Sequence, residues 1–212
     1  YSMYEQYQNI TKEQFLENNG FKSEKEFLEY LKLDYRRNLY YDEYVESLIS
    51  DKDIEKYYKN EVFGDVNSKH ILVSVSSDDT SENEKELSDE DAKKLANEII
   101  DKLNKGTSWD DVIAEYKDKI TAEELGYRAF NASLDAAYLK EMKNLEVNTY
   151  SKTPILSSYG YHIVYKIDQK DKPELKDVKE DIINILVEEK KNDDSNLYQK
   201  ALINLRKEAK LE

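Results

Sequence analysis

The chain contains two histidines, and each stands at the start of a short apolar run. His70 lies in Ser-Lys-His-Ile-Leu-Val (68–73), and His162 lies in Tyr-Gly-Tyr-His-Ile-Val-Tyr (159–165). β-Branched and aromatic runs favour strands, so we predict two adjacent strands of one sheet that present paired imidazoles. Imidazole nitrogens donate and accept hydrogen bonds near neutral pH, which suits a binding or catalytic site. The alternative is a pair of core histidines between strands; the two equivalent settings favour a site.

The composition excludes several classes of protein. With 212 residues the chain can bury a core as one large or two small domains. A net charge of −14 argues against a nucleic-acid partner. The absence of cysteine excludes disulfides, thiol catalysis and thiolate metal sites. No apolar run approaches the roughly 20 residues of a membrane span. Because the chain begins at Tyr1 without a signal-like segment, we expect a mature or trimmed form, with any membrane anchor outside it.

The elements around the histidines predict an α+β fold. Residues 67–169 read as β-α-α-β-α-β-β, a mixed sheet with helices packed on it. Its predicted elements are a strand at 67–76, helices capped by Ser88 and Ser108, a strand at 125–127, a helix at 134–145, an extended segment at 149–156 and a strand ending at Ile167. Residues 76–90 are acidic and lack apolar periodicity, which predicts a solvated loop.

Both ends of the chain read as helical. Residues 1–66 contain cap signals at Thr11 and at Ser23 with Glu26, followed by apolar residues at helical spacing from Phe27 to Leu48. Residues 170–212 carry two further apolar stripes, separated by a polar break at 192–194. Stripes of this kind need a partner, so we predict one all-α lobe built from residues 1–66 and 170–212, with 67–169 inserted between them.

Three motifs, in this order, resemble the parvulin-type peptidyl-prolyl isomerases: Ser-Lys-His-Ile-Leu-Val, Glu-Leu-Gly-Tyr and Tyr-Gly-Tyr-His-Ile-Val. The flanks, with Gly-Phe-Lys-Ser-Glu-Lys-Glu (20–26) leading into a long helix, resemble PrsA-type foldases, the extracytoplasmic chaperones of Gram-positive bacteria. This resemblance implies an isomerase domain within a chaperone lobe, no cofactor or metal, and clients that are unfolded secreted polypeptides with X-Pro bonds. It also implies a location at the outer side of the cell membrane, as in a lipoprotein.

The resemblance also assigns roles to single residues. His70 and His162 would form the polar floor that stabilises the twisted amide, and Ser157 takes the place of a threonine that supports the imidazoles. Leu134, Tyr138 and Tyr127 would bind the substrate, the first two as the apolar wall for the proline ring. The family's Ser-x-Asp or Ser-x-Cys segment is shortened here to residues 116–122, where Asp118 is the candidate acid. This departure predicts weak catalysis.

Two functions remain open. The chain is either a peptidyl-prolyl isomerase within a secretion foldase, or a non-catalytic holdase whose parvulin-like domain only binds peptide. Acidic residues after Val75, where phospho-directed parvulins carry Lys and Arg, argue against phosphopeptide specificity. Tyrosines in the helical lobe would also permit a homodimer.

Overall fold

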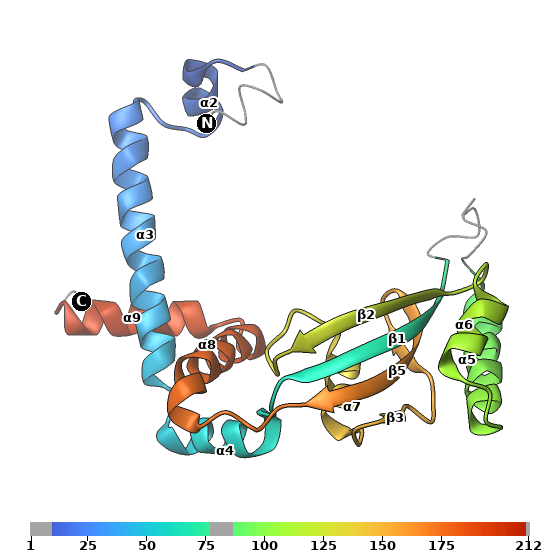
Figure 1. The fold of residues 1–212 in the computed structure, drawn as a ribbon. Helices are drawn as coiled ribbons and strands as arrows, with labels where there is room; N and C mark the ends of the chain where they lie inside the picture. Colours follow the sequence, from blue (N-terminus) through green and yellow to red (C-terminus); the bar gives the residue numbers. More distant parts are fainter. Residues whose placement is uncertain (1–9, 77–86, 211–212) are drawn as a thin grey trace. The chain divides into compact units, whose positions relative to one another are not determined.

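The computed structural model describes residues 10–76 and 87–210, and the chain divides into two compact units. One unit is helical and combines Tyr1–Lys56 with Lys179–Glu212; the other, Tyr57–Val178, is built around a β-sheet (Figure 1). Most of the acidic stretch for which we predict a loop, residues 77–86, lies outside the described residues. Within the described ranges, no helix combines the length and apolar character needed to cross a membrane.

The helical unit takes its helices from both ends of the chain. They are α2 (Lys12–Asn18), α3 (Glu24–Ser47), the first part of α4 (Asp51–Glu61), most of α8 (Leu175–Asp193), and α9 (Leu197–Glu208). Thr11 and Gln14 form a complete capping box at the start of α2. Ser23 caps α3 by accepting from the backbone of Glu26, but the Glu26 carboxylate binds the backbone of Lys22 instead of completing the predicted box.

The core of the helical unit lies at the C-terminal half of α3. Val45 is fully buried and packs with Val187 of α8 and Leu197 of α9, so the C-terminal stripes do pack against an N-terminal helix. Much of the stripe between Phe27 and Val45 remains exposed. Leu28, Leu31 and Leu39 remain 42–47% exposed, although their helical spacing predicts burial. Helical periodicity shows which residues share a face, and whether another element covers that face depends on tertiary packing.

Among the described residues of the sheet unit, strands pair in the order β2-β1-β5-β3 (Figure 1), and β4 also pairs with β5. They are β1 (Val66–Ser74), β2 (Thr121–Arg128), β3 (Thr149–Tyr150), β4 (Ile155–Ser157) and β5 (Gly160–Gln169). The prediction of a mixed sheet is wrong in its strand directions, because the four strand pairings are antiparallel. For β4 and β5 the reason is the two-residue connection of Ser158 and Tyr159, which can join only antiparallel strands.

Helices cover both faces of this sheet. On one face, α5 (Asp89–Asn104) and α6 (Trp109–Tyr116) pack on an apolar core that includes Ile71 and Ile163. On the other face lies α7 (Ala136–Asn144). Successive side chains of a strand alternate between faces, so Ser68, His70 and Leu72 project away from the apolar core and toward α7.

Gly160 sets the close approach of β5 to β1 at the start of the second histidine motif. Its φ of 131° is a conformation that side chains rarely permit, and a Cβ there would lie 2.2 Å from the carbonyl oxygen of Val73. The glycine therefore allows β5 to begin directly beside β1. Two residues later, His162 is aligned with Leu72 across the ladder.

Candidate functional site

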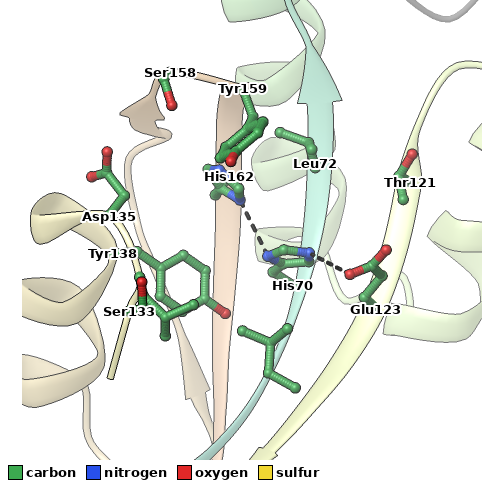
Figure 2. Close-up of a pocket in the computed structure, with 12 residues that line it drawn as sticks. His70, Leu72, Thr121, Glu123, Ser133, Asp135, Tyr138, Ser158, Tyr159 and His162 are labelled. Atoms are coloured by element: carbon green, nitrogen blue, oxygen red, sulfur yellow. Dashed lines mark hydrogen bonds and ion pairs between the residues drawn. The ribbon is translucent and has the colours of Figure 1, made fainter. Parts of the chain in front are cut away.

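The two histidines meet on the α7 face of the sheet. In the ladder between β1 and β5, His70 is aligned with Val164, and Leu72 is aligned with His162. The two imidazoles therefore lie on the same face of the sheet, diagonally across neighbouring strands. Their Nδ1 atoms lie 3.2 Å apart, and the ring centroids are 4.9 Å apart (Figure 2). The predicted pairing of imidazoles from distant segments is present in the structure.

A chain of polar contacts runs through this pair and favours one set of tautomers. The Ser157 hydroxyl lies 2.7 Å from Nε2 of His162, on the side of that ring away from His70. At the other end, a carboxylate oxygen of Glu123 lies 3.9 Å from Nε2 of His70 (Figure 2). A carboxylate stabilises a proton on the nitrogen that faces it. With that proton on Nε2 of His70, its Nδ1 accepts from His162, whose Nε2 accepts from the hydroxyl of Ser157.

In this arrangement the N–H of His70 points toward Glu123. Nε2 of His70 is buried and has no hydrogen-bond partner among the described residues, and His70 is only 7% exposed. Unpaired buried polar groups are uncommon in folded proteins and are concentrated where function requires them. The site therefore contains a buried polar atom without a partner among the described residues, which favours a functional role for His70.

Burial keeps both imidazoles neutral at physiological pH. Desolvation lowers the pKa of His162 to about 4, with a further contribution from His70 and an opposing one from Asp135. Desolvation also lowers the pKa of His70, and the charge of Glu123 opposes that change. The pair can thus donate and accept hydrogen bonds without carrying charge.

Tyr138 of α7 forms one wall beside the histidines. Its ring packs edge-on against both imidazoles, with centroid distances of 5.6 Å to His70 and 5.5 Å to His162. The hydroxyl, which needs a partner when buried, lies 3.4 Å from the hydroxyl oxygen of Ser68. Burial raises the pKa of Tyr138 to about 12, so the hydroxyl stays protonated.

A cavity of about 580 Å³ opens above the histidines. Apolar side chains line part of it, from Leu72, Leu125, Leu134 and Tyr138. Leu134 precedes α7 and is not part of it, because Asp135 caps the helix and the first helical residue is Ala136. The helix predicted at 134–145 therefore begins two residues later, but Leu134 and Tyr138 still face the same cavity.

Two predicted residues lie elsewhere. Tyr127 does not line the cavity: it is aligned with Asn67, whose side chain projects to the face opposite His70, and its hydroxyl donates to Asp168. The expectation that Tyr127 binds substrate is therefore corrected by the strand register. Asp118 lies in the exposed turn after α6 and is also not part of the cavity lining.

The acid beside the histidines is Glu123, which sequence reasoning missed. It lies on β2 directly opposite His70, with Leu125 bulged out between positions 124 and 126. The sequence predicts a strand only from Leu125 onward, which leaves Glu123 outside the sheet. A strand beginning at Thr121 would have suggested Glu123 as a candidate, but the bulge that fixes its alignment gives no clear sequence signal.

The fold and this site define a class of protein. Residues 53–171 match the PPIC-type PPIASE domain, and the chain belongs to that family of peptidyl-prolyl isomerase domains. The prediction of a parvulin-type isomerase domain is thereby confirmed.

More particularly, the chain is similar to PrsA foldases. It is 28% identical over 167 residues to the foldase protein PrsA of Bacillus subtilis (strain 168), covering 77% of this chain and 50% of that protein. It is 29% identical over 203 residues to foldase protein PrsA 4 of Bacillus cereus, covering 92% of this chain and 61% of that protein. The chain thus spans between half and two thirds of these relatives.

A solved structure supports the fold. The crystal structure of peptidylprolyl isomerase (PrsA) from Bacillus cereus superposes with a TM-score of 0.53 at 24% identity, covering 100% of this chain and 73% of that one. The comparisons thus agree with the resemblance to PrsA foldases, and the family that they establish for this chain is that of the PPIC-type domain.

Proposed function

We propose that the chain catalyses the cis/trans isomerisation of X-Pro bonds through His70, His162 and the cavity above them. The observation that carries this proposal is the hydrogen-bonded pair of His70 and His162 in the lining of a partly apolar cavity. The uncatalysed rotation has a barrier of about 18–20 kcal/mol. It breaks no bond and requires neither a nucleophile nor a metal.

In this proposal some residues bind the proline ring and others stabilise the twisted amide. The apolar wall of Leu134 and Tyr138 accommodates a pyrrolidine ring, which removes the proline from water. In the twisted amide the nitrogen loses its conjugation with the carbonyl. Its lone pair is then localised and can accept a hydrogen bond from the histidines. A donor held at that point stabilises the transition state more than the planar ground state. Ser157 is a positioning residue, since it touches His162 and not the cavity.

The test is proline exchange in a tetrapeptide, measured by NMR with the wild type and with His162→Ala. The wild type should accelerate exchange, and the variant should lose most of the gain, on the order of 100-fold as for other removed polar groups that stabilise a transition state. Tyr127→Phe is the matched control, because it changes an aromatic residue on the opposite face and should leave exchange unchanged. Equal rates for wild type and His162→Ala would overturn the proposal.

Clients and location follow from the same resemblance. We propose that the substrates are unfolded or partly folded secreted polypeptides, and that the protein acts outside the cytoplasm, attached to the membrane through an anchor. The likeness to PrsA foldases supports both statements. We also propose that residues 1–66 and 170–212 form the chaperone lobe, and that residues 67–169, inserted between them in the sequence, form the isomerase domain.

The exposed stripe on α3 favours a second function, the holding of unfolded chains. Leu28, Leu31 and Tyr35 are 42–69% exposed along one helix, and such apolar surface is typical of sites that contact other polypeptides. Full-length His162→Ala should still suppress aggregation of a denatured client if the helical unit holds chains independently. A variant with Leu28→Ser and Leu31→Ser should lose that suppression and keep its exchange activity.

A further inference from the structure

The charges around the histidine cavity are all of one sign. Two carboxylates line it, Glu123 from β2 and Asp135 at the start of α7, whereas no Lys or Arg is present among the described lining residues. Figure 2 shows them on opposite sides of the histidine pair. A ligand at the floor of this cavity is therefore flanked by negative charge on both sides.

Glu123 presents its charge near the cavity mouth. The strand register fixes its backbone opposite His70, while its side chain remains 59% exposed. Its closest approach to His70 is 3.9 Å, too long for a hydrogen bond, so the carboxylate keeps hydrogen-bonding capacity for a ligand.

Asp135 is held in position by the helix that it caps. Its side chain accepts a hydrogen bond of 2.8 Å from the backbone of Ala137, and the N-terminus of α7 favours a negative charge there. Its charge also raises the pKa of His162 against the effect of burial, so its field extends to the cavity floor.

The histidine pair shows where the X-Pro bond would lie between these charges. Both imidazoles line the cavity, and the amide nitrogen, which becomes a hydrogen-bond acceptor when the bond twists, is the group that they would stabilise. Consecutive Cα atoms are about 3.8 Å apart. The side chain of the residue before proline therefore begins within a few ångströms of the histidines, and a long cationic side chain can reach either carboxylate.

We propose that the cavity selects peptides in which Lys or Arg precedes proline and disfavours those with Glu or Asp at that position. This specificity rests on the proposed isomerase function and assigns it a substrate class. Glu123 and Asp135 are its specificity-determining residues.

The experiment compares tetrapeptides that differ only before proline, with Lys, Leu or Glu at that position. Each exposed ion pair changes affinity only a few-fold. Glu123 and Asp135 attract the lysine of the Lys-Pro peptide and repel the glutamate of the Glu-Pro peptide. Together these effects should make kcat/KM roughly tenfold higher for Lys-Pro than for Glu-Pro. The ratio should shrink at high salt, because exposed charges are screened over about 3 Å at 1 M ionic strength.

Matched variants separate the local charges from the net charge of the protein. Glu123→Gln and Asp135→Asn each remove one charge, and asparagine preserves the helix cap. Together they should bring the ratio close to one. Glu124→Gln is the control, since Glu124 is aligned with Lys69 on the opposite face of the sheet and its loss should preserve the ratio. A longer peptide with Lys four residues from proline should gain nothing over its uncharged equivalent.

The outcomes distinguish this proposal from the isomerase proposal itself. Equal rates for the three wild-type peptides, or a ratio that survives the double variant, would overturn the charge preference while isomerisation stands. If no peptide is accelerated, the isomerase proposal fails, and the charge preference is then decided by NMR titration of the same peptides. Tighter binding of Lys-Pro that disappears in the double variant supports it, and equal affinities overturn it.

Discussion

The two faces of one sheet differ in what they bury. On the α5 and α6 face, Ile71, Val73 and Ile163 are fully buried among apolar side chains. On the α7 face, the same two strands bury Ser68, His70, His162 and Lys166. Buried polar groups reduce stability unless each finds a partner. On this face Lys166 donates to the backbone oxygen of Leu145, whereas Nε2 of His70 has no partner among the described residues.

The difference shows how one small domain combines stability with a reactive surface. The apolar face is packed by the protein's own side chains and needs no bound ligand, so it can hold β1 and β5 in register. Because the polar face belongs to the same two strands, that register also brings His70 and His162 within hydrogen-bonding distance. The comparison predicts that substitutions on the two faces separate stability from activity.

The largest expected effect comes from two neighbouring residues of β1 that face opposite ways. Ile71→Ala should destabilise the protein by about 2–5 kcal/mol, because it leaves a cavity in the apolar core, while the remaining folded protein keeps its exchange activity. Leu72→Ala should cost less, since Leu72 is only half-buried and faces the site, but should weaken peptide binding. Urea denaturation and peptide titration measure the two effects. Equal stability losses would contradict the division between the faces.

A smaller effect is expected from acid. An unfolded histidine has a pKa near its usual value of 6.5, whereas burial lowers the pKa of His162 in the folded protein to about 4. Between these values the unfolded state binds more protons, so stability is present above pH 6.5 and falls as the pH drops toward 4. The difference corresponds to about 3 kcal/mol.

Urea denaturation at pH 7 and pH 4 tests this loss. His162→Gln is the control, because it lacks the titrating group and should lose less stability over the same range. A variant that loses as much as the wild type would show that His162 does not carry the effect.

The smallest expected effect comes from the hydroxyl of Tyr138. Tyr138→Phe removes a hydrogen bond to Ser68 that is already long at 3.4 Å, and should cost no more than about 1 kcal/mol. The ring that packs against both histidines remains, so exchange activity should stay close to the wild type. Tyr138→Ala, which removes the ring as well, should reduce both stability and activity. If Tyr138→Phe abolishes exchange, the hydroxyl acts directly in the site and the apolar-wall role is wrong.

Local patterns in the sequence predicted much of this site. The two His-Ile motifs are short apolar strands, and the alternation of side chains places both imidazoles on one face. Ser157, Leu134 and Tyr138 followed from their motif positions, and the structure brings all three to the histidines or the cavity. The roles assigned to them remain predictions.

Features that depend on the exact register between distant segments could not be predicted. The position of Glu123 is set by the register of β2 against β1 and by the bulge at Leu125. Tyr127 was misplaced for the same reason, because a shift of one residue transfers a side chain to the other face. The exposure of Leu28 and Leu39 is likewise a property of tertiary packing that helical spacing does not contain.

The position of Glu123 on a strand, and not on a loop, has a consequence for how this protein could change. A charge carried on a loop can be relocated by insertions with little effect on the rest of the fold. Here the backbone hydrogen bonds of β2 fix the carboxylate, so adding or deleting one residue between Glu123 and Gly126, with the pairing of residues 126–128 retained, would turn the acid away from His70 and place a neighbour there. A mutation that changes the pairing of β2 would therefore change ligand preference and sheet assembly together.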